Sequence, residues 1–164
     1  MTTKLYKTKN DLPEAARTKL VELLNSRLVS AIDLQTQAKQ AHWNVKGPQF
    51  IALHELFDKV SESAENAVDE IAERAVQLGG VARGTARIVA KESALKEYAL
   101  DAVTGAEHVE ALASALAAFG SQVRSAIALA FTSEESEATY KATKNARCLR
   151  DGEAPSDWPL AIGE

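Results

Sequence analysis

The sequence contains few of the residues that interrupt or cross-link a folded chain. Its 164 residues include one cysteine, four prolines and eight glycines. The single cysteine, Cys148, excludes an internal disulfide and any zinc or iron–sulfur site built from several cysteines. Alanine, the strongest helix former, occupies 30 positions. We therefore expect an all-α protein rather than one built on β-sheets.

Long apolar segments are also scarce. The longest stretch without a charged residue runs from Ala111 to Val123 and has 13 residues, whereas a membrane span needs roughly 20. The first ten residues contain no apolar run that could act as a secretion signal. We therefore expect a cytoplasmic protein without a membrane segment.

The charge is close to balanced, but it is unevenly distributed. Lys and Arg number 19 against 23 Asp and Glu, which gives a net charge of −4. The first ten residues carry three lysines and no acid, and we expect residues 1–10 to be a flexible basic tail. These lysines are Lys4, Lys7 and Lys9. Residues 151–164 carry four acids and no base, and we expect an acidic tail there.

Residues 11–150 carry the pattern of a four-helix bundle. Apolar residues recur there at helical spacing, and Gly-Pro or Gly-Gly pairs follow the first two helices. The expected helices span residues 11–45, 49–78, 104–131 and 132–150. The connection over residues 81–104 is long and contains one short helix. A crossover of this length joins two parallel neighbours, which is typical of a ferritin-like bundle.

Three helix starts are indicated by capping residues. Asp11 with Glu14 forms the first expected capping box, in which a cap side chain and a glutamate three residues later satisfy each other's backbone N–H groups. Thr104 with Glu107 forms the second, and Thr132 with Glu135 forms the third. The last of the expected helices is mostly polar from Tyr140 onward.

The second expected helix carries a line of acidic residues. The line begins with a histidine and continues with five acids, all within a sector roughly 100° wide at helical spacing. These residues are His54, Asp58, Glu62, Glu65, Asp69 and Glu73. Between the first and last of these positions there are seven acids and one base. A solvated face of a helical scaffold is the ordinary interpretation of such a stripe. Like charges four residues apart destabilise a helix, however, and bound cations would offset their repulsion.

The stripe is symmetric about its midpoint. His54 and Glu73 lie equally far from the midpoint, and so do Asp58 and Asp69. On one helix, His54 and Glu73 would be roughly 28 Å apart. Two antiparallel copies of the helix would instead place His54 of one copy beside Glu73 of the other. Two identical sites would result. No histidine here follows a glutamate by three residues, as the usual di-iron site within a bundle requires. The register therefore predicts a metal site between two subunits.

A set of motifs in residues 38–82 resembles a known family. The motifs are HWNVKGP at 42–48, Phe50, His54-Glu55, Asp58, Asp69, Glu73-Arg74-Ala75 and Leu78-Gly79-Gly80. They closely resemble the signature of the Dps family, the DNA-binding proteins from starved cells, and the resemblance extends more weakly to Arg124. It implies a hollow dodecamer of ferritin-like bundles. Such a dodecamer oxidises Fe(II), typically with hydrogen peroxide, and stores the ferric mineral, which protects against oxidative damage.

The resemblance also implies roles for individual residues. One subunit would supply His42, His54 and Asp58 to an iron-oxidising site, and the other would supply Asp69 and Glu73. Imidazole and carboxylate ligands suit iron, but they also accept zinc, cobalt or manganese. Trp43 is either a core residue or a nearby electron donor, and the resemblance favours the donor. His108 has no such partners, and we expect it to be exposed or structural.

Two further roles are predicted at the ends of the chain. The resemblance places a three-fold entry pore at Glu134, Glu135 and Glu137, although acids at a helix start also favour the helix dipole. Twelve copies of the lysine tail would bind DNA weakly and in a salt-dependent way. The alternative function is therefore a nucleoid-associated protein that coats DNA with little iron turnover. The closing helix, poor in apolar and aromatic residues, departs from the family pattern.

Overall fold

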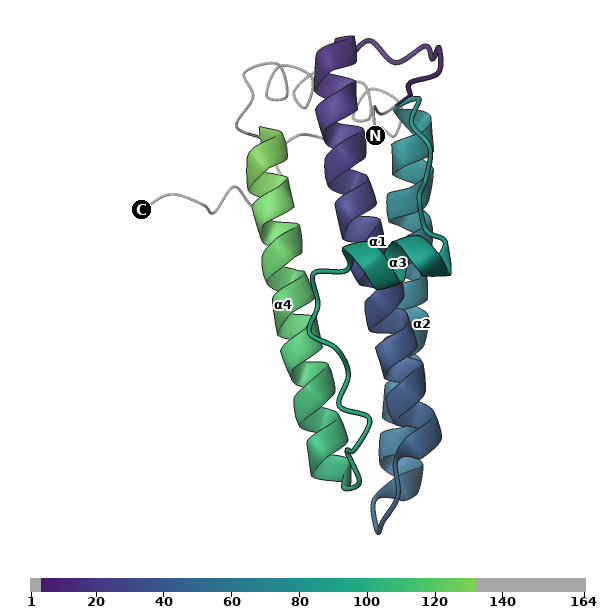
Figure 1. Ribbon diagram of the computed structural model, residues 1–164, viewed down its shortest axis with the longest axis vertical. Coiled ribbons are helices and arrows are strands. Elements are labelled where there is room, and N and C mark those ends of the chain that lie inside the picture. Colours follow the sequence, from purple (N-terminus) through teal and green to yellow (C-terminus); the bar gives the residue numbers. More distant parts are fainter. Residues whose placement is uncertain (1–3, 132–164) are drawn as a thin grey trace, which may run out of the picture. The chain divides into compact units, whose positions relative to one another are not determined.

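The computed structural model describes residues 4–131, which form four helices and contain no strand (Figure 1). The helices are α1 (Glu14–Asn44), α2 (Phe50–Gln77), α3 (Ala86–Glu92) and α4 (Gly105–Phe131). The predicted all-α class and the short helix in the crossover are confirmed. The predicted helix 132–150, the acidic tail 151–164 and Cys148 lie outside the described residues.

The chain divides after residue 126 into two compact units. The first unit, residues 1–126, contains α1, α2, α3 and most of α4. Residues 127–131 at the end of α4 belong to the second unit. The candidate site and the buried clusters described below all lie in the first unit.

The hairpin of α1 and α2 turns at Gly47. Its φ of +104° lies in the left-handed region, which glycine adopts without steric cost. The α1 helix ends at Asn44, one residue before the predicted end, and the Phe50 N–H donates to the Gly47 carbonyl at 3.0 Å. The two helices consequently lie side by side, as Figure 1 shows.

The start of α1 differs from the prediction. Helix α1 begins at Glu14 with Pro13 in the capping position and no side-chain cap, so Asp11 is not the cap that the sequence predicts. The side chain of Asn10 instead accepts the Leu12 N–H at 2.9 Å, which forms a local turn before the helix. The expected capping box at this end is therefore wrong.

The end of α2 is closed by two glycines, as predicted. Gly79 has a φ of +87°, and its N–H donates to the Val76 carbonyl at 2.8 Å. The Gly80 N–H donates to the Ala75 carbonyl at 2.9 Å, which completes the hydrogen-bond pattern of a Schellman motif. A Cβ atom at Gly80 would lie 2.3 Å from Cγ1 of Val21, so this position also needs glycine for close packing.

The N-terminal segment is attached to this end of α2, whereas the sequence predicts a flexible tail. Three donors of residues 4–17 bind the last carbonyl groups of α2 and its cap, which have no partners within the helix. The bonds join Tyr6 N to Gly79 O (2.7 Å), Thr8 Oγ1 to Gln77 O (3.4 Å) and Arg17 Nη1 to Leu78 O (3.1 Å). The side chains of the three tail lysines are not buried by this contact, and all three residues are exposed.

The buried core brings together α1, α2, α4 and the crossover. One cluster consists of Ala38, Ala41, Val45, Phe57, Tyr98 and Leu112, and a second consists of Leu34, Ala64 and Ala115. The crossover after α3 is held against α1 by side chains of that helix. Ser93 Oγ donates to Asp33, and Gln37 Nε2 donates to the Lys96 carbonyl at 3.0 Å.

Helix α4 begins with the predicted capping box. The carboxylate of Glu107 accepts the backbone N–H of Thr104 at 2.7 Å and that of Val103 at 2.9 Å. The Glu107 N–H in turn donates to Thr104 Oγ1 at 3.3 Å. These hydrogen bonds lower the pKa of Glu107 below its ordinary value, so its carboxylate stays charged at the positive end of the helix.

Helix α4 is also apolar over most of its length. Residues Gly105–Ala130 are long and apolar enough to cross a bilayer, with a mean hydropathy of 1.3 in their most apolar window. The prediction of no membrane segment uses the length of the longest stretch without a charged residue, which is a stricter criterion than mean hydropathy. Within residues 4–131 of the structure, 11% of that window is buried. Leu112 and Ala115 of α4 are buried against α1 and α2.

Candidate metal centre

His42 and His54 lie against each other where α1 and α2 are joined. Their rings are stacked, with centroids 3.6 Å apart and an interplanar angle of 22°. His42 Nδ1 lies 2.9 Å from the His54 carbonyl oxygen, and His54 Nδ1 lies 2.8 Å from the His42 carbonyl oxygen. Because a carbonyl only accepts, each Nδ1 carries a hydrogen, so the tautomer with its lone pair on Nε2 is the neutral form that fits these contacts. This arrangement is the one that metal-binding histidines require.

Asp58 is one helical turn after His54 and completes this group. Its Oδ1 is 3.9 Å from His42 Nδ1, and it forms an ion pair with Nζ of Lys39 on α1. The Lys39 hydrogen bond lowers the pKa of Asp58 below its ordinary value, and the positive charge of Lys39 adds to this effect. The carboxylate is therefore charged at neutral pH, and a metal ion at this position would replace Lys39 as its partner.

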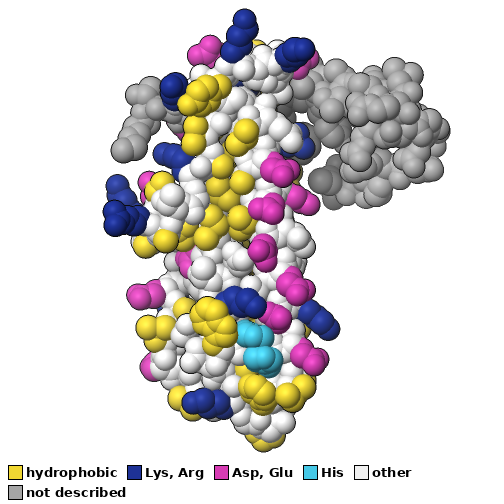
Figure 2. Space-filling view, turned by 90° about the vertical axis from the view of Figure 1, so that its right-hand side faces the viewer, with side chains coloured by type: hydrophobic (Ala, Val, Ile, Leu, Met, Phe, Trp, Pro, Cys, Tyr) yellow, Lys and Arg dark blue, Asp and Glu magenta, His cyan; other side chains and the backbone are white. Residues whose placement is uncertain are grey.

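Asp69 and Glu73 lie farther along α2 and are exposed. Figure 2 shows acidic side chains continuing in a line from the two histidines. Among residues 4–131, no three His, Cys, Asp or Glu side chains are close enough together to hold a metal ion. One chain thus places the five predicted ligands in two groups: His42, His54 and Asp58, and separately Asp69 and Glu73.

Two comparisons with known proteins identify the family. A model of the ferritin-like domain matches residues 21–144. A DNA protection during starvation protein from Agrobacterium fabrum is 46% identical over 124 residues, which is 76% of this chain and 76% of the relative. The chain belongs to the Dps family.

Solved Dps structures have the same fold. DpsA14 from Streptomyces coelicolor superposes with a TM-score of 0.75 at 26% identity, over 99% of this chain and 100% of that one. Dps from Mycobacterium smegmatis gives a TM-score of 0.73 at 25% identity, over 90% of this chain and 91% of that one. The ferritin-like architecture and the Dps resemblance predicted from the sequence are therefore confirmed.

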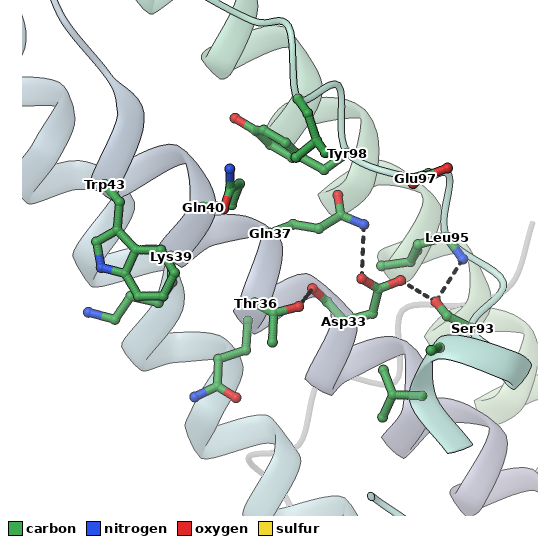
Figure 3. A pocket seen from close by; sticks show the side chains of 14 residues that line it. Asp33, Thr36, Gln37, Lys39, Gln40, Trp43, Ser93, Leu95, Glu97 and Tyr98 are labelled. Atoms are coloured by element: carbon green, nitrogen blue, oxygen red, sulfur yellow. Dashed lines mark hydrogen bonds between the residues drawn. The ribbon is translucent and has the colours of Figure 1, made fainter. Parts of the chain in front are cut away.

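Trp43 of this Dps chain is on the surface rather than in the core. The residue is 68% exposed, although its neighbour Ala41 is fully buried. It lines a groove of about 780 Å³ between α1 and the crossover, where Figure 3 shows Asp33 hydrogen-bonded to Gln37 and Ser93. The core-packing alternative for Trp43 is wrong. Its role as an electron donor stays a prediction.

The candidate centre is surrounded by exposed apolar side chains as well as by acids. Figure 2 shows apolar groups on both sides of the histidines. The exposed apolar residues near this end of the hairpin are Trp43 (68%), Phe50 (39%), Ile51 (64%) and Leu56 (48%). Phe50 also contacts His54, with ring centroids 5.0 Å apart. The surface around the candidate centre therefore combines apolar contact area with charged groups.

A buried polar pair near the centre is missed by the sequence interpretation. His108 is 1% exposed, which selects the structural alternative over the exposed one. Its Nδ1 lies 2.5 Å from the hydroxyl oxygen of Tyr98 in the crossover. The crossover has no helical periodicity from which this contact could be predicted. The only sequence signal is an aromatic hydroxyl in the segment LKEYAL, which mixes polar and apolar residues.

The remaining predicted site residues have different outcomes. The pore candidates Glu134, Glu135 and Glu137 lie outside the described residues. Lys4, Lys7 and Lys9 are exposed, but they belong to the segment that is hydrogen-bonded to the end of α2. Their role in DNA contact remains a prediction.

Proposed function

We propose that this Dps-family protein is a cytoplasmic ferroxidase that stores iron. It oxidises Fe(II), typically with hydrogen peroxide, at sites shared by two subunits, and it deposits the ferric product inside a hollow dodecamer. The observation that carries the proposal is the group formed by His42, His54 and Asp58. In this group each histidine directs Nδ1 to a backbone carbonyl, which leaves Nε2 for a ligand, and the Asp58 carboxylate lies 3.9 Å from His42.

The ligand types support iron as the substrate. Imidazole nitrogen and carboxylate oxygen together suit Fe(II), and carboxylates stabilise the additional positive charge of Fe(III). The backbone carbonyls that accept the Nδ1 hydrogens fix the orientation of both imidazoles before iron arrives. Asp58 is already deprotonated at neutral pH, so metal binding there requires no proton release from this group.

The second half of the site is proposed to come from another copy of the chain. Asp69 and Glu73 are exposed and lie on the same helix face as Asp58, at the distances from the midpoint that a two-fold axis requires. The exposed Phe50 and Ile51 supply apolar surface that such a contact would bury. The pairing would also place carboxylates of one copy beside the histidines of the other.

A pair of iron ions explains the protective chemistry. Reduction of one hydrogen peroxide molecule to two water molecules takes two electrons and two protons. Two Fe(II) ions supply the electrons and become Fe(III), and the protons come from solvent. Both electrons reach the peroxide at one site, so no hydroxyl radical leaves the protein.

The test is the addition of Fe(II) without oxygen, followed by hydrogen peroxide, with ferric absorbance as the measurement. We expect rapid oxidation by the natural protein and its loss in the double variant His54→Ala, Asp58→Ala. The matched control is Glu70→Ala, which removes an acid from α2 outside the stripe. Equal rates in the double variant and the natural protein would disprove the site assignment.

Size-exclusion chromatography tests the storage part of the proposal. We expect the mass of a dodecamer and a soluble ferric mineral that elutes with the protein. A stable dimer would keep the shared sites but would have no cavity, so ferric precipitate outside the protein would contradict storage while leaving oxidation intact.

A second candidate function is the coating of DNA. It is favoured by the exposure of Lys4, Lys7 and Lys9 on one short segment. We expect a gel shift at low salt that disappears near physiological salt, because phosphate contacts release counterions. The triple variant of these lysines to glutamine should remove it. A shift that persists at high salt in the triple variant would assign DNA binding to another surface.

A further inference from the structure

Tyr98 and His108 form a polar pair in the core close to the candidate metal centre. The Tyr98 hydroxyl oxygen is 2.5 Å from His108 Nδ1, and the two rings are nearly parallel at 18°. The exposed fractions are 9% for Tyr98 and 1% for His108. A phenol that is shielded from solvent and hydrogen-bonded to an imidazole can lose an electron and pass its proton to the imidazole in the same event.

The direction of this hydrogen bond follows from its surroundings. Burial raises the pKa of Tyr98, so the phenol keeps its proton at neutral pH. His108 Nε2 is buried and has no hydrogen-bond partner among the residues that the structure describes. Donation from Tyr98 to Nδ1 leaves one polar hydrogen unpaired, whereas the opposite direction leaves both the phenol hydrogen and the Nε2 lone pair unpaired. Tyr98 is therefore the donor, and His108 Nδ1 is the acceptor.

Phe57 connects this pair to the candidate centre. Its ring meets that of His108 edge to face, with centroids 6.4 Å apart, and it immediately precedes Asp58 on α2. Ala41, on α1, packs in the same buried cluster as Phe57 and Tyr98. The cluster that contains Tyr98 thus includes the residues directly before two predicted iron ligands, His42 and Asp58.

The pair also borders a route for protons. A pocket of about 180 Å³ is lined by Tyr98 and His108 together with the polar residues Gln40, Asn44 and Lys46. A polar pocket of this size has room for water molecules. A proton placed on the imidazole therefore lies beside a polar path and is not enclosed by apolar groups alone.

We propose that Tyr98 is an auxiliary electron donor and His108 the acceptor of its proton, for a centre that holds one iron ion instead of two. This inference rests on the proposed ferroxidase function. One Fe(II) gives one electron to hydrogen peroxide and becomes Fe(III). Tyr98 gives the second electron and becomes a neutral tyrosyl radical, while its hydroxyl proton moves to His108 Nδ1. Two protons from solvent complete the formation of two water molecules.

The location of Tyr98 distinguishes it from the exposed Trp43. An oxidised indole at Trp43, which is 68% exposed, would react with molecules in solution. Tyr98 is 9% exposed, and its oxidised form is stabilised by the proton held on its partner. The pair therefore allows a tyrosyl radical to persist until another Fe(II) ion reduces it.

Electron paramagnetic resonance of rapidly frozen samples tests the proposal. Hydrogen peroxide is added to protein loaded with one Fe(II) per predicted site. We expect a tyrosyl signal that is lost in Tyr98→Phe and retained in the matched control Tyr6→Phe, whose side chain is exposed. The signal should decrease when two Fe(II) ions are supplied per site, because iron then provides both electrons. A signal that persists in Tyr98→Phe would overturn the assignment.

His108→Gln tests the proton transfer. Glutamine keeps a hydrogen-bond acceptor but is not a base, so we expect the tyrosyl signal to be lost although the variant folds. Circular dichroism checks the fold. An unchanged signal in folded His108→Gln would show that the hydrogen bond is only structural and would overturn the proposal.

Photochemical oxidation without iron separates this inference from the proposed function. A photogenerated ruthenium(III) polypyridyl complex is the oxidant, and the signal should again depend on both Tyr98 and His108. Absence of a Tyr98-dependent signal in this experiment would overturn the pair. If the signal forms here and ferric absorbance forms with iron, but no radical accompanies iron oxidation, the donor role is wrong and the ferroxidase function stands. If no ferric absorbance forms, the ferroxidase function fails and the donor role fails with it.

Discussion

The histidines of this protein occupy two contrasting environments. His42 and His54 are half-buried, and each has Nδ1 fixed by a backbone carbonyl, so Nε2 is left for a ligand. His108 is buried, and its Nδ1 is bound to Tyr98. The same side chain is thus prepared for metal binding in one place and for proton transfer in the other. Burial and the partner of Nδ1 determine the difference.

Removing Phe57 should produce the largest effect, because it disturbs both environments. The ring is 1% exposed and packs in the main cluster. We expect Phe57→Ala to lower the free energy of unfolding by about 3–5 kcal/mol, as for other buried aromatic residues. Denaturant unfolding measures the change. Val76→Ala, an exposed apolar truncation on the same helix, should change it by no more than about 0.5 kcal/mol. Equal effects in the two variants would contradict the described core.

Removing one histidine of the candidate centre should affect iron oxidation more than stability. Losing an outer partner of a metal ligand costs about 10- to 100-fold in affinity or activity, so His54→Ala should lower the oxidation rate by more than about 100-fold. Its melting temperature should change little, because the side chain is only half-buried. Stopped-flow ferric absorbance and thermal unfolding give the two numbers. If His54→Ala lost much stability but oxidised iron normally, His54 would be a structural residue and not a metal ligand.

Removing the Tyr98 hydroxyl should affect stability to an intermediate extent. Tyr98→Phe keeps the ring in the core but leaves His108 Nδ1 without its donor, and an unsatisfied buried acceptor costs about 1–2 kcal/mol. Denaturant unfolding of this variant measures the loss. A variant as stable as the natural protein would mean that water replaces the hydroxyl. Tyr98 and His108 would then be more accessible to water than His42 and His54 are.

Removing the charge of Lys39 should produce the smallest effect, seen only in the pH dependence. Lys39 lowers the pKa of Asp58, so Asp58 stabilises the fold above its unfolded pKa, and this contribution disappears as the pH falls through the folded pKa. Lys39→Met raises the folded pKa, and the acid limb of iron oxidation should move to higher pH. The exposed Lys59 on α2 provides the control variant Lys59→Met, which should leave the limb in place. Identical pH profiles for the two variants would exclude this role of Lys39.

Features set by neighbouring residues could be predicted from the sequence. The capping box of Thr104 and Glu107 and the glycine stop at Gly79 both involve residues within a few positions of each other. The symmetric spacing of the acidic stripe is likewise a property of one helix. The Asp11 cap was wrong because Asn10 and Pro13 set a competing local geometry.

Features that depend on contacts between distant segments could not be predicted. Tyr98 and His108 meet only because the crossover folds back onto α4. The docking of the N-terminal segment depends on the free carbonyls at the end of α2. The sequence of the segment itself does not indicate where these carbonyls lie. The exposure of Trp43 depends on which side of α1 the crossover covers.

The docking of the N-terminal segment joins two parts of the chain into one cooperative unit. The Tyr6 N–H is bonded to the Gly79 carbonyl, and the Gly80 N–H is bonded to the Ala75 carbonyl beside it. Gly79 has the left-handed φ that the end of α2 requires, so release of the N-terminal segment frees the residue that holds the Gly80 bond in place. The amides of Tyr6 and Gly80 should therefore exchange with solvent deuterium at similar rates, although one lies near the chain terminus and the other ends a long helix. A segment with the composition of a tail would thus protect the helix end from fraying.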